Sequence, residues 1–196
     1  MKAAAKFKFG SDDLENKSVI VQGIGHVGES LVEHLTNDGA KVIISDINEE
    51  RLEAVKAKYG AEIYTGNNIY TEPVDIYAPC ALGATINDLT VNKIQAKIIA
   101  GAANNQLANE LFHGRILKNR GIVYAPDFLI NAGGIINVYA ELENYGKAEI
   151  MRKTENIYNT TLEILDNAKV NNLTTHAAAL NIARERIETR KRENSK

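Results

Sequence analysis

Three glycines are spaced in a way that could hold a phosphate group. Gly23, Gly25 and Gly28 lie in the segment Val19–Gly28, which reads V-I-V-Q-G-I-G-H-V-G, after an apolar β-branched run and at the start of a helical pattern. Gly23 allows a tight turn, Gly25 lets a pyrophosphate approach the backbone, and Gly28 lets the helix pack closely on the sheet. Unpaired N–H groups at the start of a helix favour negative charge. The segment therefore predicts the phosphate-binding loop of a dinucleotide site.

An acidic residue follows at the matching distance. The apolar run Lys41–Ser45 ends in Asp46, which lies 18 residues after Gly28. A carboxylate at this place accepts two hydrogen bonds from an adenosine ribose and repels a 2′-phosphate, so we expect NAD rather than NADP. In the alternative interpretation Gly25 only serves a turn and Asp46 caps a helix that starts near Asn48. The order of strand, glycine loop and helix favours the cofactor.

Three further segments carry small or amide side chains and follow predicted strands: Ala78–Ala84, Gly101–Gln106 and Pro126–Gly134. Ligands bind beyond the carboxyl ends of the strands in an open parallel sheet, so these segments and the glycine loop are expected to border one crevice. Asn104 and Asn105 offer a donor and an acceptor to a carboxamide such as that of nicotinamide. Such a pair is otherwise an ordinary turn signal.

The elements that must position these residues alternate between apolar β-type runs and helical patterns. This alternation predicts an α/β fold of the Rossmann type, doubly wound, with a mostly parallel six-stranded sheet and a C-terminal helical tail. Gly66–Pro73 is polar and is predicted to be an irregular connection. The predicted strands are Val19–Gln22, Lys41–Ser45, Ala61–Thr65, Val74–Ala78, Lys97–Gly101 and Ile122–Ala125, and the predicted helices Val27–Asn37, Glu49–Lys58, Leu107–Asn119 and a part of Gly133–Leu142.

The pattern changes beyond Gly146, where no further strand is predicted. Apolar residues from Met151 to Ala168 fall at helical spacing, Asn171-Asn172 interrupts them, and a final helix is expected from about Thr175 to Arg192. We therefore predict a dinucleotide-binding domain with a leading helix over residues 1–146 and C-terminal helices over residues 147–196. Two arrangements of this tail are open, packing on the sheet domain or reaching back to another domain.

Composition excludes several classes of function. The net charge of −2 over 196 residues gives no attraction to nucleic acid or to an anionic membrane, and no apolar run approaches the length of a membrane span. Cys80 is the one cysteine, which rules out an internal disulfide, and the four histidines show no ligand spacing, so no metal site is expected. We expect Cys80 to be a packed thiol rather than a nucleophile, and the protein to be cytoplasmic.

Several motifs occur together, in order, between Met1 and about Tyr145. On these motifs the sequence resembles the glutamate/leucine/phenylalanine/valine dehydrogenase family, and within it the leucine dehydrogenases most closely. The motifs are M-K-A-A-A-K at Met1–Lys6, V-Q-G-I-G-H-V-G at Val21–Gly28, D-I-N at Asp46–Asn48, A-P-C-A-L-G-A at Ala78–Ala84, I-N-D at Ile86–Asp88, A-N-N-Q-L at Ala103–Leu107, G-I-V-Y-A-P-D at Gly121–Asp127 and N-A-G-G-I-I-N-V at Asn131–Val138.

The resemblance implies a reversible, NAD-dependent oxidative deamination of leucine or another branched-chain or apolar L-amino acid to a 2-oxo acid and ammonia. It implies that Ile135 and Val138 wall the substrate side chain, where a glutamate carboxylate would lose hydration without a partner. Helix packing is the alternative role for both. The residues that it implies for the cofactor are Gly23, Gly25, His26, Val27 and Gly28 at the pyrophosphate, Asp46 and Ile47 at the adenosine, Cys80 and Ala81 along the cofactor, and Ala103, Asn104, Asn105 and Asn131 around the nicotinamide and substrate.

In that family the catalytic lysines and aspartate lie in an N-terminal domain, and no segment of this sequence matches it. No catalytic residue is therefore assigned, and we expect the cofactor domain alone, which binds NAD with negligible turnover and meets its amino acid through the other domain. The strongly helix-forming start Met1–Lys6 lacks an N-cap, as though cut from a longer helix. By the same resemblance the full-length enzyme is a homo-oligomer.

Two other hypotheses stay open at this point. A non-catalytic NAD sensor that gates a partner would share the glycine loop but would need no substrate recess formed by Asn104, Asn105, Asn131, Ile135 and Val138. An engineered fragment made for folding or assembly studies would also fit.

Overall fold

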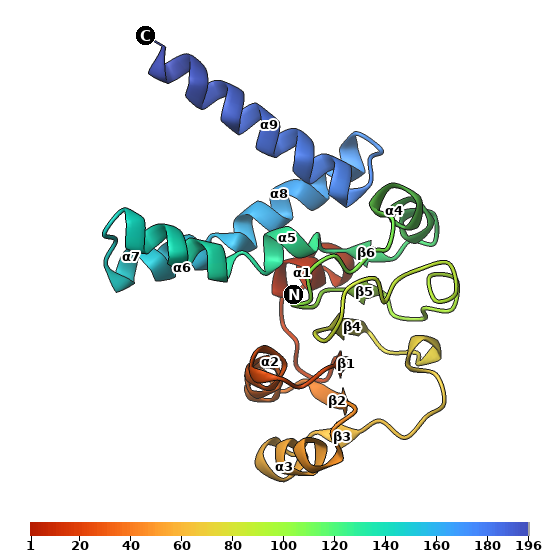
Figure 1. Ribbon diagram of the computed structural model, residues 1–196. Coiled ribbons are helices and arrows are strands. Elements are labelled where there is room, and N and C mark those ends of the chain that lie inside the picture. Colours follow the sequence, from red (N-terminus) through yellow and green to blue (C-terminus); the bar gives the residue numbers. More distant parts are fainter. Residues whose placement is uncertain (196) are drawn as a thin grey trace.

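The chain folds around one parallel sheet of six strands. In the computed structural model, which describes residues 1–195, the strand order is β3-β2-β1-β4-β5-β6, so the chain winds outward from β1 in both directions (Figure 1). All pairs are parallel. This confirms the predicted α/β fold. The strands are β1 (Ser18–Gln22), β2 (Lys41–Ser45), β3 (Glu62–Ile63), β4 (Ile76–Pro79), β5 (Ile98–Ile99) and β6 (Val123–Tyr124).

Strands β3, β5 and β6 are shorter than predicted, with two residues each. Residues beside them still donate ladder hydrogen bonds, since Ala100 N–H bonds to the Tyr77 carbonyl and Ala125 N–H to the Ile99 carbonyl, both at 3.0 Å. The apolar runs therefore mark where backbone pairs with the sheet, although regular strand geometry covers only part of them.

Both faces of the sheet are covered, which explains the unbroken apolar runs. Val19, Ile20 and Val21 of β1 are all fully buried, although successive residues of a strand point to opposite faces. Val19 and Val21 belong to one core cluster together with Leu165, whereas Ile20 belongs to another together with Leu117. A sheet of this kind leaves the carboxyl ends of its strands as the place for a ligand.

The helices agree with the predicted pattern except in four places, one of which is a break at Asn156 in the helical run expected from Met151 to Ala168. The helix expected from Leu107 begins at Glu110, because the Asn109 side chain accepts a hydrogen bond from Phe112 N–H at 2.8 Å. A short helix, α5, follows β6 unpredicted, and a 3-10 turn, η1, lies in the polar connection. The helices are α1 (Lys2–Phe9), α2 (His26–Asn37), α3 (Glu49–Tyr59), η1 (Ile69–Thr71), α4 (Glu110–Asn119), α5 (Asp127–Ile130), α6 (Gly133–Leu142), α7 (Lys147–Glu155), α8 (Ile157–Val170) and α9 (Thr175–Asn194).

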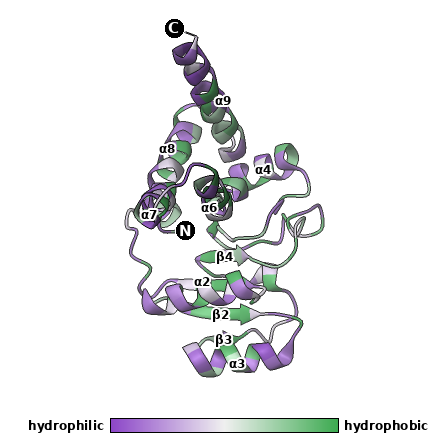
Figure 2. Ribbon diagram, turned by 60° about the vertical axis from the view of Figure 1, so that its left-hand side comes forward, coloured by the Kyte–Doolittle hydropathy of each residue, from purple (hydrophilic) through white to green (hydrophobic). Residues whose placement is uncertain are grey.

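Among the C-terminal helices, α8 packs on the core of the sheet, whereas α7 and the far end of α9 lie away from it (Figure 1). Helix α8 packs beside α1, with Leu165 buried in the core of the sheet. Ala178 and Ile182 of α9 pack on Ile164 and Ala168 of α8. The rest of α9 projects from the body, and its far end is hydrophilic (Figures 1 and 2). No helix within residues 1–195 is both long and apolar enough to cross a membrane.

Because Leu165 is 1% exposed and touches the sheet's own core, Leu165→Ala should lower the free energy of unfolding by about 2–5 kcal/mol. Ile187→Ala, on the exposed part of α9, should change it by less than about 0.5 kcal/mol. Urea unfolding followed by circular dichroism measures both values. Equal, small losses would contradict the packing of α8 as part of the sheet core.

Candidate functional site

The turn after β1 is compressed against its neighbours. Gly23 has a φ of +94°, and a Cβ at this position would lie 2.6 Å from the Cβ of Ala81. A Cβ at Gly28 would lie 2.0 Å from the carbonyl oxygen of Gly23. Both distances are below any real contact, so the turn and the approach of α2 to it require glycine at these two positions.

Gly25 differs from the other two glycines. It precedes α2 as the N-cap with φ −62° and ψ −170°, and a Cβ built on it would meet nothing within 4 Å. No side chain caps this helix, and Glu29 N–H bonds back to the Gly25 carbonyl at 2.8 Å. His26 and Val27 are exposed in the first turn. The start of α2 therefore presents backbone N–H groups, with their partial positive charge, to open space.

Asp46 ties the end of β2 to this turn. One carboxylate oxygen accepts from Ile24 N–H at 2.8 Å, and the other accepts from Asn48 N–H at 3.0 Å. Burial of the carboxylate alone would raise the pKa of Asp46, but these two N–H groups stabilise the charged form and the pKa lies below its usual value. The capping of α3 falls to the Asn48 side chain, which accepts from Arg51 N–H at 2.9 Å. The interpretation of Asp46 as the cap of that helix is therefore wrong.

A groove of about 470 Å³ lies at this end of the sheet. It brings together six of the predicted cofactor residues: Gly23, Gly25, Asp46, Ile47, Cys80 and Ala81. The groove also includes five residues that the sequence analysis missed: Gln22, Ser45, Arg51, Leu82 and Thr85. Their positions in the sequence could have identified three of them. Gln22 and Ser45 end β1 and β2, and Arg51 is in the first turn of the helix that follows Asp46.

Cys80 lies on the wall of the groove as a half-buried thiol. Burial raises the pKa of Cys80, and its sulfur accepts a weak hydrogen bond from Ala102 N–H at 3.5 Å. A raised pKa keeps the thiol protonated, which favours a packing role over a nucleophilic one.

The predicted nicotinamide residues form a second group beside the ends of β5 and β6. Asn131 donates from its side-chain nitrogen to the Asn104 side-chain oxygen at 2.5 Å. Ala103 is buried, and its N–H bonds to the Pro79 carbonyl at 3.0 Å. Asn105 is exposed in a left-handed conformation with φ +50°. None of these four residues lines the groove at the glycine loop.

A buried pair that the sequence analysis did not single out holds this second group in place. Gln106 donates from its side-chain nitrogen to the carbonyls of Gly101 at 2.6 Å and Ala103 at 3.0 Å. Its backbone N–H donates to the Asp127 carboxylate at 2.8 Å. The segment after β5 is thus fixed to the segment after β6, and Asn104 and Asn131 meet as a result.

Ile135 and Val138 lie on the outer face of α6 and are 70% and 59% exposed. With Leu142, 75% exposed, they form an apolar stripe at helical spacing. Packing inside the described chain therefore does not account for these residues. Among residues 1–195 no cluster of three or more histidine, cysteine, aspartate or glutamate side chains could hold a metal ion.

A family model described as Glutamate/Leucine/Phenylalanine/Valine dehydrogenase matches residues 44–194. The chain belongs to this dehydrogenase family. It is 50% identical to a leucine dehydrogenase of Thermoactinomyces intermedius over 96% of this chain and 51% of that one. The structure of L-tryptophan dehydrogenase from Nostoc punctiforme is 44% identical and superposes with a TM-score of 0.92, over 96% of this chain and 57% of that one.

A more distant similarity shows the fold alone. A glutamate dehydrogenase structure at 22% identity gives a TM-score of 0.72 over 96% of this chain and 50% of that one. The chain spans about half the length of the relatives that it matches. Because the chain belongs to a family of oxidoreductases, an oxidoreductase function is the one to consider for the groove.

The three-dimensional contacts of Gly25 and Gly28 predict effects of different size on stability when either glycine is replaced by alanine. Gly28→Ala forces the new methyl onto the Gly23 carbonyl and should lower the free energy of unfolding by about 1–3 kcal/mol or more. Gly25→Ala meets open space at an allowed φ and should change it by less than about 1 kcal/mol. Urea denaturation of the two variants checks the pair. Equal losses would show that α2 does not approach the turn as closely as described.

Proposed function

We propose that the groove at the glycine loop binds NAD. The observation that carries this proposal is the Asp46 carboxylate, held by two backbone N–H groups beside the uncapped start of α2. In this arrangement the pyrophosphate lies on the first turn of α2, at Gly23, Gly25, His26, Val27 and Gly28. Asp46 and Ile47 hold the adenosine ribose, since the lone pairs that Asp46 does not use for the backbone are free to accept from hydroxyl groups.

We further propose that the nicotinamide end runs along Cys80 and Ala81 towards Ala103, Asn104, Asn105 and Asn131. The amide groups of Asn104 and Asn131 suit a carboxamide, which needs both a donor and an acceptor. Bound NAD would supply the acceptor for the hydride of the reaction. The apolar stripe that contains Ile135 and Val138 is then the wall for the substrate side chain.

The activity that we propose is the reversible oxidative deamination of leucine or another apolar L-amino acid to the 2-oxo acid and ammonia. Membership of the family supports the reaction, and the names of the relatives at 44–50% identity specify leucine and tryptophan, both of which have apolar side chains. These identities also favour a dehydrogenase over a non-catalytic NAD sensor. We propose that the full enzyme is a cytoplasmic homo-oligomer.

Deamination also requires a group that takes the ammonium proton and an acid that assists the attack of water. No lysine or histidine is among the residues that line the groove, its one carboxylate already accepts from the backbone, and its one thiol is kept protonated. We propose that these duties fall to a catalytic domain outside the 196-residue chain, across the groove from the cofactor.

Calorimetric titration tests the cofactor. We expect NAD to bind the chain and NADP to bind at least about tenfold more weakly, because the Asp46 charge repels a 2′-phosphate. Gly25→Ala should weaken NAD binding about tenfold or more, since its methyl occupies space that only a ligand would use. Matched stability of this variant and the wild type is the control. Undiminished binding by Gly25→Ala would overturn the placement of the pyrophosphate.

Asp46→Asn should narrow the preference for NAD over NADP. The substitution keeps an acceptor for Ile24 N–H and removes the negative charge, and it leaves Arg51 as the cation on the groove wall. The ratio of the two dissociation constants should fall about tenfold by the same titration. An unchanged ratio would show that Asp46 does not face the ribose.

The chain alone should oxidise leucine at no measurable rate, because proton transfer lacks its base and the substrate lacks a second wall. Absorbance at 340 nm with excess NAD and leucine measures formation of the reduced cofactor. Turnover by the pure chain would refute the division of labour between this chain and a second domain.

A further inference from the structure

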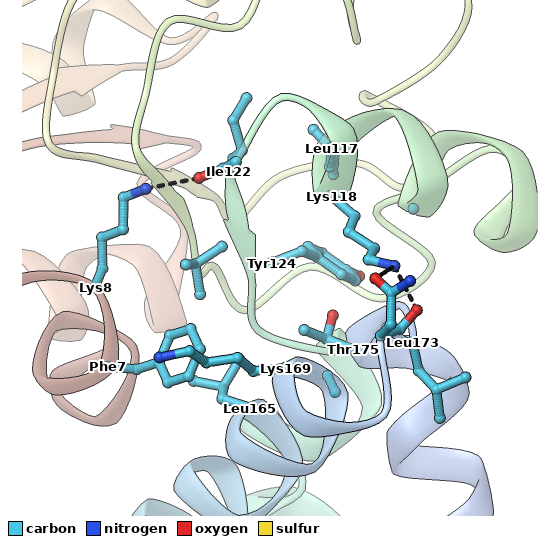
Figure 3. A pocket seen from close by; sticks show the side chains of 15 residues that line it. Phe7, Lys8, Leu117, Lys118, Ile122, Tyr124, Leu165, Lys169, Leu173 and Thr175 are labelled. Atoms are coloured by element: carbon cyan, nitrogen blue, oxygen red, sulfur yellow. Dashed lines mark hydrogen bonds between the residues drawn. The ribbon is translucent and has the colours of Figure 1, made fainter.

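A second cavity lies away from the glycine loop, at the β6 edge of the sheet, and shares no residue with the groove. It has a volume of about 370 Å³ and opens between α1, α4, β6 and α8 (Figure 3). Its walls are mostly apolar, with Phe7 from α1, Leu117 from α4, Tyr124 from β6 and Leu165 from α8. A cavity of this size and lining is in the range of small-molecule sites.

Three lysines lie around this apolar cavity, and no acidic residue is among the side chains that line it. Lys8 donates to the Gly121 carbonyl at 2.7 Å, and Lys118 donates to the backbone and side-chain oxygens of Asn172. Lys169 has its ammonium nitrogen 5.8 Å from the centre of the Phe7 ring. Within residues 1–195 none of these three lysines forms an ion pair with a carboxylate.

Lysine stems often cover apolar surface while their charges stay in water. Here the cavity stays open beneath them, so covering apolar surface does not fully account for their positions. Lys8 and Lys118 each already donate to a carbonyl group. Lys169 has no such acceptor among the described residues, which leaves one ammonium group for one anionic head group.

We propose that this cavity binds a small monocarboxylate with an apolar body, whose carboxylate pairs with Lys169 and whose body lies against the partly exposed side chains of Phe7 and Leu173. The site is separate from the proposed dinucleotide groove and does not depend on it. Apolar burial supplies affinity roughly in proportion to chain length, and the charge selects an acid over an alcohol of the same shape.

Octanoate is a suitable probe, with 1-octanol as the neutral ligand of the same length. We expect octanoate to bind the 196-residue chain at least tenfold more tightly than 1-octanol at low salt, and to shift the NMR signals of the Leu173 methyl groups. Lys169→Met keeps an apolar side chain of similar length and removes the charge. It should weaken octanoate at least tenfold and leave 1-octanol unchanged, whereas Lys147→Met, at an exposed site on α7, should leave both unchanged.

Three results would overturn the proposal: no octanoate binding at millimolar concentration, equal binding of octanoate by wild type and Lys169→Met, or equal binding of octanoate and 1-octanol. Saturating NAD should leave the octanoate affinity unchanged within twofold, because the two cavities share no wall. Displacement of octanoate by NAD would place the acid in the groove and would also overturn it. Failure of NAD to bind would count against the dinucleotide groove alone, because the octanoate titration does not use it.

Discussion

The contact between helix α2 and the turn after β1 is the constraint on which the groove depends. A Cβ on Gly28 would overlap the Gly23 carbonyl at 2.0 Å, so the helix starts as close to the sheet as a backbone allows. This closeness directs the first N–H groups of α2 to the carboxyl end of β1, where the neighbouring strands also end. The partial positive charge of a helix N-terminus falls off within one turn, so a helix set further back could not supply it.

The fold holds Asp46 in one orientation at this end of the sheet before any ligand arrives. Its two oxygens hold the backbone of Ile24 and Asn48, so the fold itself determines how the carboxylate is oriented. Removing a partly buried carboxylate from water is unfavourable, and the two hydrogen bonds offset that cost, as the lowered pKa of Asp46 indicates. The same bonds take the Ile24 amide out of use for phosphate. The pyrophosphate that we propose at the loop is thereby left to Gly25 and the residues after it.

The sequence was sufficient to predict what depends on local patterns. The parallel sheet follows from the alternation of apolar β-type runs with helical patterns, and the glycine loop follows from Gly23, Gly25 and Gly28 in their context. Features that depend on contacts distant in sequence were missed. Gln106 acts through Asp127, 21 residues away. The second cavity joins residues from Phe7 to Thr175, which no local pattern connects.

The sheet separates the two cavities. The groove is built on β1, β2 and β4, whereas the second cavity is built on β6 and on helices beyond it, and β5 lies between β4 and β6. Tightly packed layers such as Ile98 and Ile99 of β5, both fully buried, do not deform gradually. Coupling between distant sites needs an element with two discrete arrangements. The buried link between Gln106 and Asp127 joins the segment after β5 to the start of α5, and α5 packs against α8, which forms one wall of the second cavity. Because both partners of this link are buried and held by hydrogen bonds, we expect the two cavities to bind their ligands independently.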